Sequence, residues 1–139
     1  MSPLLGFLRR GPISPRLHGT LDYPLAAILL GGPRALDFND DTAAAFVLAV
    51  GGAASVLAVG TAWSRGIVRL VPPIVHGVAD LGATTALIAA PFVLGFTGDR
   101  RATAFCVAVG AGGLGATLLT RFESDLELPA DAARAQPAV

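Results

Sequence analysis

Residues 42–64 read TAAAFVLAVGGAASVLAVGTAWS, a run without a single charged side chain. A helix needs about 20 predominantly apolar residues to cross the hydrocarbon core of a bilayer. This run is apolar around the whole circumference of a helix, whereas a helix in a soluble bundle would need a polar outer face. We therefore predict that it forms a transmembrane helix.

Three further segments, residues 17–33, 70–98 and 102–120, contain no acidic or basic side chains apart from isolated histidines and aspartates. Each is long enough to cross a bilayer. The connections between the segments are short, which predicts that neighbouring helices run antiparallel. The expected fold is all-α, a bundle of four transmembrane helices over residues 16–32, 42–63, 73–96 and 102–121.

The composition agrees with a membrane protein. Hydrophobic residues make up 53% of the chain and charged residues only 14%, with a mean hydropathy of +0.65, while a soluble domain carries about a quarter charged residues. Ten arginines balance ten acidic residues, and this zero net charge without a basic patch argues against nucleic-acid binding. The single cysteine, Cys106, excludes a disulfide framework and a cysteine-rich zinc site. The expected partner is the lipid bilayer.

The arginines predict the orientation in the membrane. Seven lie on the side of the chain termini and three on the opposite side, so the positive-inside rule places both termini in the cytoplasm of a bacterium, with the protein multi-pass in the inner membrane. Trp63, at the end of the second helix, is expected at the membrane interface. The seven are Arg9, Arg10, Arg16, Arg65, Arg69, Arg121 and Arg134.

These features divide the chain into five parts. We expect an interfacial segment at the N-terminus, two transmembrane hairpins joined by a cytoplasmic loop, and an acidic, flexible tail. In order they cover residues 1–14, 15–63, 64–72, 73–122 and 123–139.

The two hairpins are related in sequence. Placing Pro15 on Pro73 aligns residues 15–41 with residues 73–99 without a gap, and nine of the 27 positions are identical. The second helix aligns with the fourth after a single insertion, which pairs Phe46 with Phe105. We therefore predict two parallel two-helix repeats, related by an axis along the membrane normal.

Each repeat begins with the pattern Pro-x-x-His-Gly-x-x-Asp, at residues 15–22 and 73–80, and a Pro-x-x-Leu-x-Phe segment follows at Pro33 and Pro91. The pattern, over about residues 12–122, resembles the SPW-repeat integral membrane proteins of bacteria and archaea. The name-giving Ser-Pro-Trp is replaced here by Gly-Pro-Arg and Ala-Pro-Phe. The resemblance implies a small four-helix membrane protein and carries no activity with it.

The candidate site residues are His18, Asp22, His76 and Asp80. Each histidine and its aspartate have i, i+4 spacing and so share one helix face. Each aspartate is expected about 6 Å deeper in the membrane than its histidine. Because an unpaired charge in the bilayer is costly, these side chains should face the bundle interior.

Three interpretations of this polar cluster remain open. In the first, hydrogen bonds between the residues fix the helix register, with Gly19 and Gly77 allowing another helix to come close. In the second, His18, Asp22, His76 and Asp80 bind zinc, iron or manganese. In the third, His18 and His76 are the axial ligands of a b-type haem.

The sequence favours the first interpretation, because polar groups at helix contacts more often stabilise bundles than perform chemistry. The predicted role is then structural or accessory, through self-association or as a subunit of a membrane complex. We identify no catalytic residue, since neither a Gly-x-Ser-x-Gly segment nor a glycine-rich phosphate loop is present.

Asp99 serves as a contrast to Asp80. It belongs to the segment Gly98-Asp99-Arg100-Arg101 between two predicted helices, where we expect it to be exposed to water. Replacement by asparagine should then change the free energy of unfolding by no more than about 0.5 kcal/mol.

Overall fold

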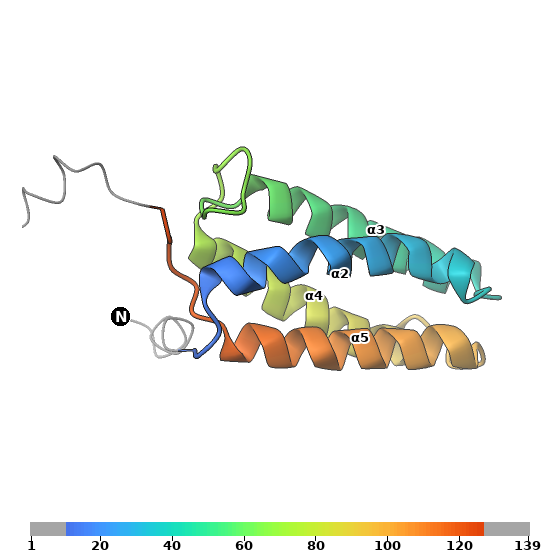
Figure 1. The fold of residues 1–139 in the computed structure, drawn as a ribbon. Coiled ribbons are helices and arrows are strands. Elements are labelled where there is room, and N and C mark those ends of the chain that lie inside the picture. Colours follow the sequence, from blue (N-terminus) through green and yellow to red (C-terminus); the bar gives the residue numbers. More distant parts are fainter. Residues whose placement is uncertain (1–10, 127–139) are drawn as a thin grey trace, which may run out of the picture.

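The computed structural model describes residues 11–126, and this part of the chain is all-helical (Figure 1). The observed helices coincide with the four predicted segments to within one helical turn at every boundary. The N-terminal residues predicted to be interfacial lie largely outside the described range, as does most of the predicted tail. The four helices of the described part are α2 (Pro15–Ala35), α3 (Asp41–Gly60), α4 (Pro73–Val93) and α5 (Arg100–Leu119).

The helix starts follow from local sequence. Ser14 accepts a hydrogen bond from the backbone N–H of Leu17 and so caps α2, and Asp40 caps α3 in the same way through the N–H of Ala43. Proline occupies the first position of α2 and of α4, where the missing N–H leaves no hydrogen bond unmade.

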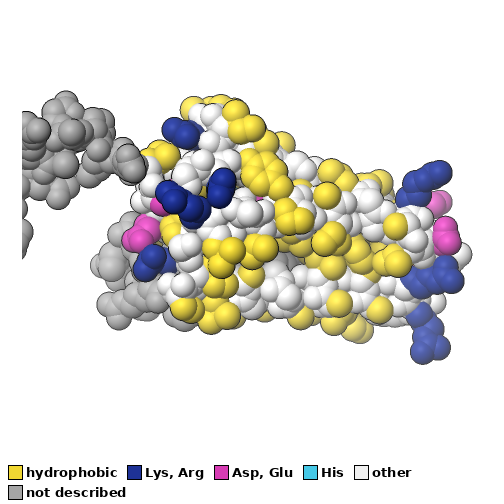
Figure 2. Space-filling view, in the orientation of Figure 1, with side chains coloured by type: hydrophobic (Ala, Val, Ile, Leu, Met, Phe, Trp, Pro, Cys, Tyr) yellow, Lys and Arg dark blue, Asp and Glu magenta, His cyan; other side chains and the backbone are white. Residues whose placement is uncertain are grey.

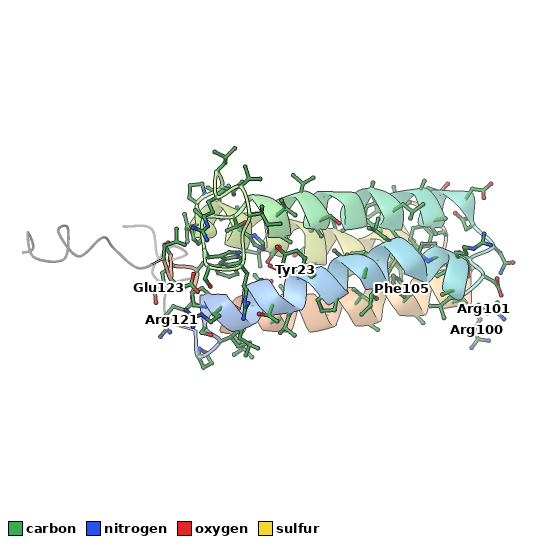
Figure 3. All side chains as sticks on the ribbon, turned by 45° about the horizontal axis from the view of Figure 1, so that its top comes forward. Tyr23, Arg100, Arg101, Phe105, Arg121 and Glu123 are labelled. Carbon is green, nitrogen blue, oxygen red and sulfur yellow. The ribbon has the colours of Figure 1, made fainter. Side chains whose placement is uncertain are left out.

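Three of these helices, α3, α4 and α5, are long and apolar enough to cross a membrane. The fourth, α2, has the same length as α4 but is less apolar, because it contains Arg16, Asp22 and Arg34. Charged side chains gather at the two ends of the bundle, and the surface between them is apolar (Figure 2). Arg121 and Glu123 lie at one end, and the labelled arginines that begin α5 lie at the other (Figure 3).

The helices pair along the chain. α2 packs against α3 and α4 packs against α5, whereas contacts between the two pairs are much fewer. The larger hydrophobic core lies between all four helices and includes Leu29, Val47, Leu87 and Cys106. A second, smaller core at the other end consists of Trp63 and Phe122, with Ile74 packed against them.

The segments that leave α3 and α5 turn back against the starts of α4 and α2. Thr61 forms an isolated bridge with Val71, and Thr120 forms one with Ile13. Beyond α5, Asp125 accepts hydrogen bonds from the backbone N–H and the hydroxyl of Ser64, both at 2.6 Å. These contacts bring the loop after α3 and the chain after α5 together around one end of the bundle.

Asp99 is not exposed, and our expectation for it was wrong. It caps α5 by accepting hydrogen bonds from Arg101 N and Ala102 N, both at 3.1 Å. Its second oxygen accepts from Asn39 N at 2.6 Å and Asp40 N at 3.2 Å in the loop between α2 and α3. Although removal from water raises the pKa of Asp99, these four donors lower it more, and the net shift is below its ordinary value. Asp99 therefore both caps α5 and joins the two hairpins at this end of the bundle.

Candidate metal centre

The structure brings all four predicted residues together. His18 and Asp22 project from the first two turns of α2, and His76 and Asp80 project from the corresponding turns of α4. One ligand atom from each residue can be chosen so that all four lie within 4.8 Å of one another. The cluster therefore joins two helices that otherwise make few contacts.

The imidazole Nε2 atoms both face the carboxylates. His18 Nε2 lies 3.0 Å from Asp80 Oδ2 and 3.3 Å from Asp22 Oδ1. His76 Nε2 lies 3.1 Å from Asp80 Oδ2 and 3.5 Å from Asp22 Oδ2. His18, His76 and Asp22 are buried, and the side chain of Asp80 keeps 21% of its surface exposed.

The other ring nitrogen of each histidine is bound by a threonine. His18 Nδ1 lies 2.7 Å from Thr120 Oγ1, and His76 Nδ1 lies 2.7 Å from Thr61 Oγ1. Each threonine hydroxyl also donates to the backbone carbonyl at position i−4, at 2.6 Å for Thr61 and 2.7 Å for Thr120. Since a hydroxyl has one proton to give, it accepts from the imidazole, and Nδ1 is therefore the protonated nitrogen.

This assignment determines what Nε2 can do. A neutral imidazole protonated on Nδ1 has its lone pair on Nε2, directed at the space between the carboxylates. Histidines that bind metals have this arrangement, in which an acceptor holds the distal N–H and fixes the tautomer and the ring orientation. Thr61 and Thr120 are thus suited to be the outer shell of a metal site.

Asp22 is incompletely satisfied by the protein. Its side chain is nine-tenths buried, and its Oδ2 atom has no hydrogen-bond partner. A buried polar atom without a partner costs about 1–3 kcal/mol, and more when it is charged. This oxygen points into the same space as the Nε2 atoms, where a cation would satisfy it.

The charge of the cluster leads to the same conclusion. Two ionised aspartates beside two neutral histidines give a net charge of −2 among buried apolar side chains. Buried charges need compensation, and here either two additional protons or one divalent cation supplies it. Metal binding and proton binding are therefore alternatives at this site.

The distances between the histidines and the carboxylates are close to those around a tetrahedral ion. Bonds of about 2.0–2.1 Å to nitrogen and oxygen place the ligands of a tetrahedral zinc ion about 3.3–3.4 Å apart. The four histidine–carboxylate distances, 3.0, 3.1, 3.3 and 3.5 Å, lie on both sides of this value, although they involve both oxygens of Asp22. One ligand atom from each residue spreads over up to 4.8 Å, so the side chains would have to draw closer together around an ion.

Two aromatic rings cover the cluster. The ring centroid of Trp63 lies 4.6 Å from that of His76, and the centroid of Phe122 lies 5.1 Å from that of His18. Trp63 is fully buried, so its ring contacts the protein and not the lipid, and its depth near the membrane interface stays a prediction. Neither these two rings nor the two threonines were predicted as part of the site. The alignment of the second helix with the fourth, continued past the helix ends, does pair Thr61 with Thr120 and Trp63 with Phe122.

The glycines beside the histidines allow these rings to approach. A Cβ atom added at Gly77 would lie 2.7 Å from the ring of Phe122, and one added at Gly19 would lie 3.1 Å from the ring of Trp63. We predicted that these glycines let another helix come close. Instead, a close neighbour of each glycine is an aromatic side chain.

A haem does not fit between the two histidines. Asp80 Oδ2 already lies within 3.1 Å of both Nε2 atoms, so a carboxylate occupies the place where a porphyrin would lie. Trp63 and Phe122 close the surrounding space. The donor set suits a bare metal ion instead.

Comparison of the chain with protein-family models, with curated protein sequences and with solved structures finds no match. The resemblance to SPW-repeat proteins therefore stays a prediction.

Proposed function

We propose that this chain is a membrane protein that binds one zinc ion through His18, Asp22, His76 and Asp80. The observation that carries the proposal is the buried convergence of two Nε2 atoms and two carboxylates, with each Nδ1 held by a threonine. Imidazole and carboxylate ligands suit zinc, iron and manganese, whereas calcium and magnesium prefer oxygen ligands alone. Among these, zinc is the ion that most regularly takes four nitrogen and oxygen ligands in a single site.

A second candidate is a metal-free clamp, the structural role that the sequence favours. Its support is Asp80 Oδ2, which lies at hydrogen-bonding distance from both imidazoles and can link α2 to α4 by itself. The two functions differ in their demand on Asp22. Asp22 makes only the longer contacts to the histidines, at 3.3 and 3.5 Å, so a clamp depends mainly on Asp80, while a zinc site needs Asp22 as a ligand.

The deciding experiment measures metal content. Purified protein is stripped with a chelator, reloaded with Zn²⁺ or Co²⁺, and analysed by elemental mass spectrometry and by visible absorption. We expect one zinc ion per chain and the intense d–d bands of tetrahedral Co²⁺ in the wild type and in Asp37→Asn, whose side chain is 86% exposed. Asp22→Asn should lose both signals. Retention of metal by Asp22→Asn, or no stoichiometric metal in the wild type, would favour the clamp.

We further propose that all four helices cross a bacterial inner membrane with both termini in the cytoplasm. α2 supports this by its length, equal to that of α4, and by its packing along the apolar helix α3. Its buried Asp22 faces the cluster and not the lipid. Large apolar side chains exposed on the bundle, such as Val56, Phe92 and Val93, suit contact with lipid, a second copy or another membrane protein.

We also propose that the two hairpins are repeats of one unit of the SPW type. The alignment that pairs the first residues of α2 and α4 also pairs their last residues, and the alignment of α3 with α5 does the same at both ends. The threonines that hold the histidines, Thr61 and Thr120, are equivalent in that second alignment. In this view each unit supplies one histidine and one aspartate, and each threonine holds the histidine of the other unit.

A further inference from the structure

A cavity of about 390 Å³ lies beside the His/Asp cluster. This volume is within the range of about 300–1,000 Å³ that small-molecule sites occupy. All four helices contribute to its walls, and three members of the cluster, His18, Asp22 and Asp80, line it. The cavity therefore extends from the proposed zinc site along the helices.

The walls of the cavity differ along its length. Around the cluster they carry polar groups, including the hydroxyl-bearing residues Thr84 and Thr117. Elsewhere they are apolar, formed by residues such as Leu25, Ile28, Leu29, Val50 and Leu87. A ligand that fits such a cavity has a polar end and an apolar body.

The mouth of the cavity lies between α2 and α5. Leu21 and Ile28 line it from α2 while remaining 47% and 51% exposed, so the cavity opens on the outside of the bundle. On α5 the lining residue Gly112 leaves the space beside it unfilled. A Cβ atom added at Gly112 would meet no atom within 4 Å.

The exposed residues at this opening, Leu21 and Ile28, belong to the middle turns of α2. The charged side chains gather at the ends of the bundle, and the surface between these ends is apolar (Figure 2). In a membrane-spanning bundle a ligand would enter it from the lipid phase. With zinc bound, the two aspartates and the ion sum to zero charge, and the ion accepts a lone pair from a neutral or anionic oxygen, which a cationic ammonium group cannot give.

We propose that the cavity binds a lipid with one hydrocarbon chain, whose chain lies between α2 and α5 and whose terminal oxygen approaches the zinc ion from the cavity as a fifth ligand. This inference rests on the proposed zinc site for the head group. The place of the chain depends on the cavity alone, so the two parts can be tested separately.

The probe is a palmitic acid with a photoreactive diazirine in its chain, added to the zinc-loaded protein in nanodiscs. After irradiation, the labelled peptides are identified by mass spectrometry. We expect labelling of the α2 and α5 segments that line the cavity, and competition by unlabelled palmitic acid or hexadecanol but not by hexadecane. Competition by the acid alone would identify an anionic head group, and competition by both would identify any oxygen donor.

Gly112→Leu fills the cavity and should abolish this labelling while the zinc content stays at one ion per chain. Gly115→Leu is the matched control, because an added Cβ there also meets no atom and the residue does not line the cavity. Undiminished labelling in Gly112→Leu, or labelling spread evenly over the helices, would overturn the proposed chain site. Equal competition by hexadecane would overturn the role of the head group. Cavity labelling in a wild-type protein that takes up no zinc on loading would mean that the zinc site is wrong and the chain site is right.

Discussion

His18 Nδ1 lies 2.7 Å from Thr120 Oγ1, although the two residues are far apart in the sequence. The threonine hydroxyl donates to the carbonyl of Ala116, which leaves it only an acceptor for the ring N–H. One hydrogen bond thus fixes the tautomer, turns Nε2 toward the two carboxylates and holds the end of α5 against the start of α2.

Replacing Thr120 with valine should weaken zinc binding without removing a ligand. Loss of an outer-shell partner typically costs about 10–100-fold in metal affinity. Competition with a chromophoric zinc chelator measures the change, with Thr85→Val as control. Thr85 also donates to the carbonyl at position i−4, at 2.7 Å, but it is exposed and contacts no histidine. Equal affinities in both variants would mean that the threonine does not orient the ligand.

Zinc binding should release protons. If Nε2 of both histidines is protonated when the metal is absent, one zinc ion displaces about two protons, and the affinity rises as the pH increases. Isothermal titration calorimetry in buffers of different ionisation enthalpy gives the proton count. A heat that is independent of the buffer would show that the cluster holds no exchangeable protons.

Bound zinc should also stabilise the fold. A ligand that binds only the native state stabilises it by about 2.7 kcal/mol at a concentration of one hundred times its Kd. The melting temperature in detergent should therefore fall when a chelator is added and recover when zinc is restored. The Asp22→Asn protein should show no response to either addition.

The close approach of Phe122 to Gly77 makes a further prediction. A methyl group at position 77 would lie 2.7 Å from the ring, and such overpacking costs about 1–3 kcal/mol. Gly82→Ala on the same helix adds a methyl group that meets nothing within 4 Å, so helix propensity should leave it neutral or stabilising by up to about 1 kcal/mol. Unfolding in mixed micelles with SDS compares the two. Equal stability of both variants would show that the ring of Phe122 moves aside without cost. Adding Phe122→Leu to Gly77→Ala should restore the stability that the added methyl group removes.

Much of this architecture could be predicted because charge and length alone separate the helices. The i, i+4 spacing of His18 and Asp22, together with their copies near residue 76, was enough to predict a polar cluster inside the bundle. The role of the threonines could not be predicted in the same way. Thr61 and Thr120 lie just past their own helices, and they reach the histidines only because the chain turns back there.

Trp63 and Asp99 show what local sequence leaves out. A tryptophan at a helix end usually suits a membrane interface, and here a glycine in α2 also opens a place for the ring over the histidines. Asp99 stands among charged loop residues, and its burial depends on backbone N–H groups of the distant loop between α2 and α3. Tertiary contacts of this kind leave no periodic signal in the sequence.

The Asp99 contacts give the last prediction. Asp99→Ala removes acceptors for four backbone N–H groups, two in α5 and two at Asn39 and Asp40. Asp99→Asn can keep the two bonds of the cap but turns an amide NH₂ toward the N–H groups of the other loop. We expect a cost of about 1–3 kcal/mol for alanine, a smaller cost for asparagine, and at most about 0.5 kcal/mol for the control Asp37→Asn.

The same contacts predict a dependence on pH. Because the pKa of Asp99 in the folded protein lies below its ordinary value of 3.8, its contribution is present above about pH 4 and is lost as the pH falls through the folded-state pKa. The free energy of unfolding, measured in mixed micelles between neutral pH and about pH 3, should therefore fall more steeply with acid in the wild type than in Asp99→Asn. Parallel curves for the two proteins would mean that the charge of Asp99 does not contribute to joining the hairpins. An Asp99→Ala protein with unchanged free energy of unfolding would mean that the two loops are held together by their apolar contacts alone.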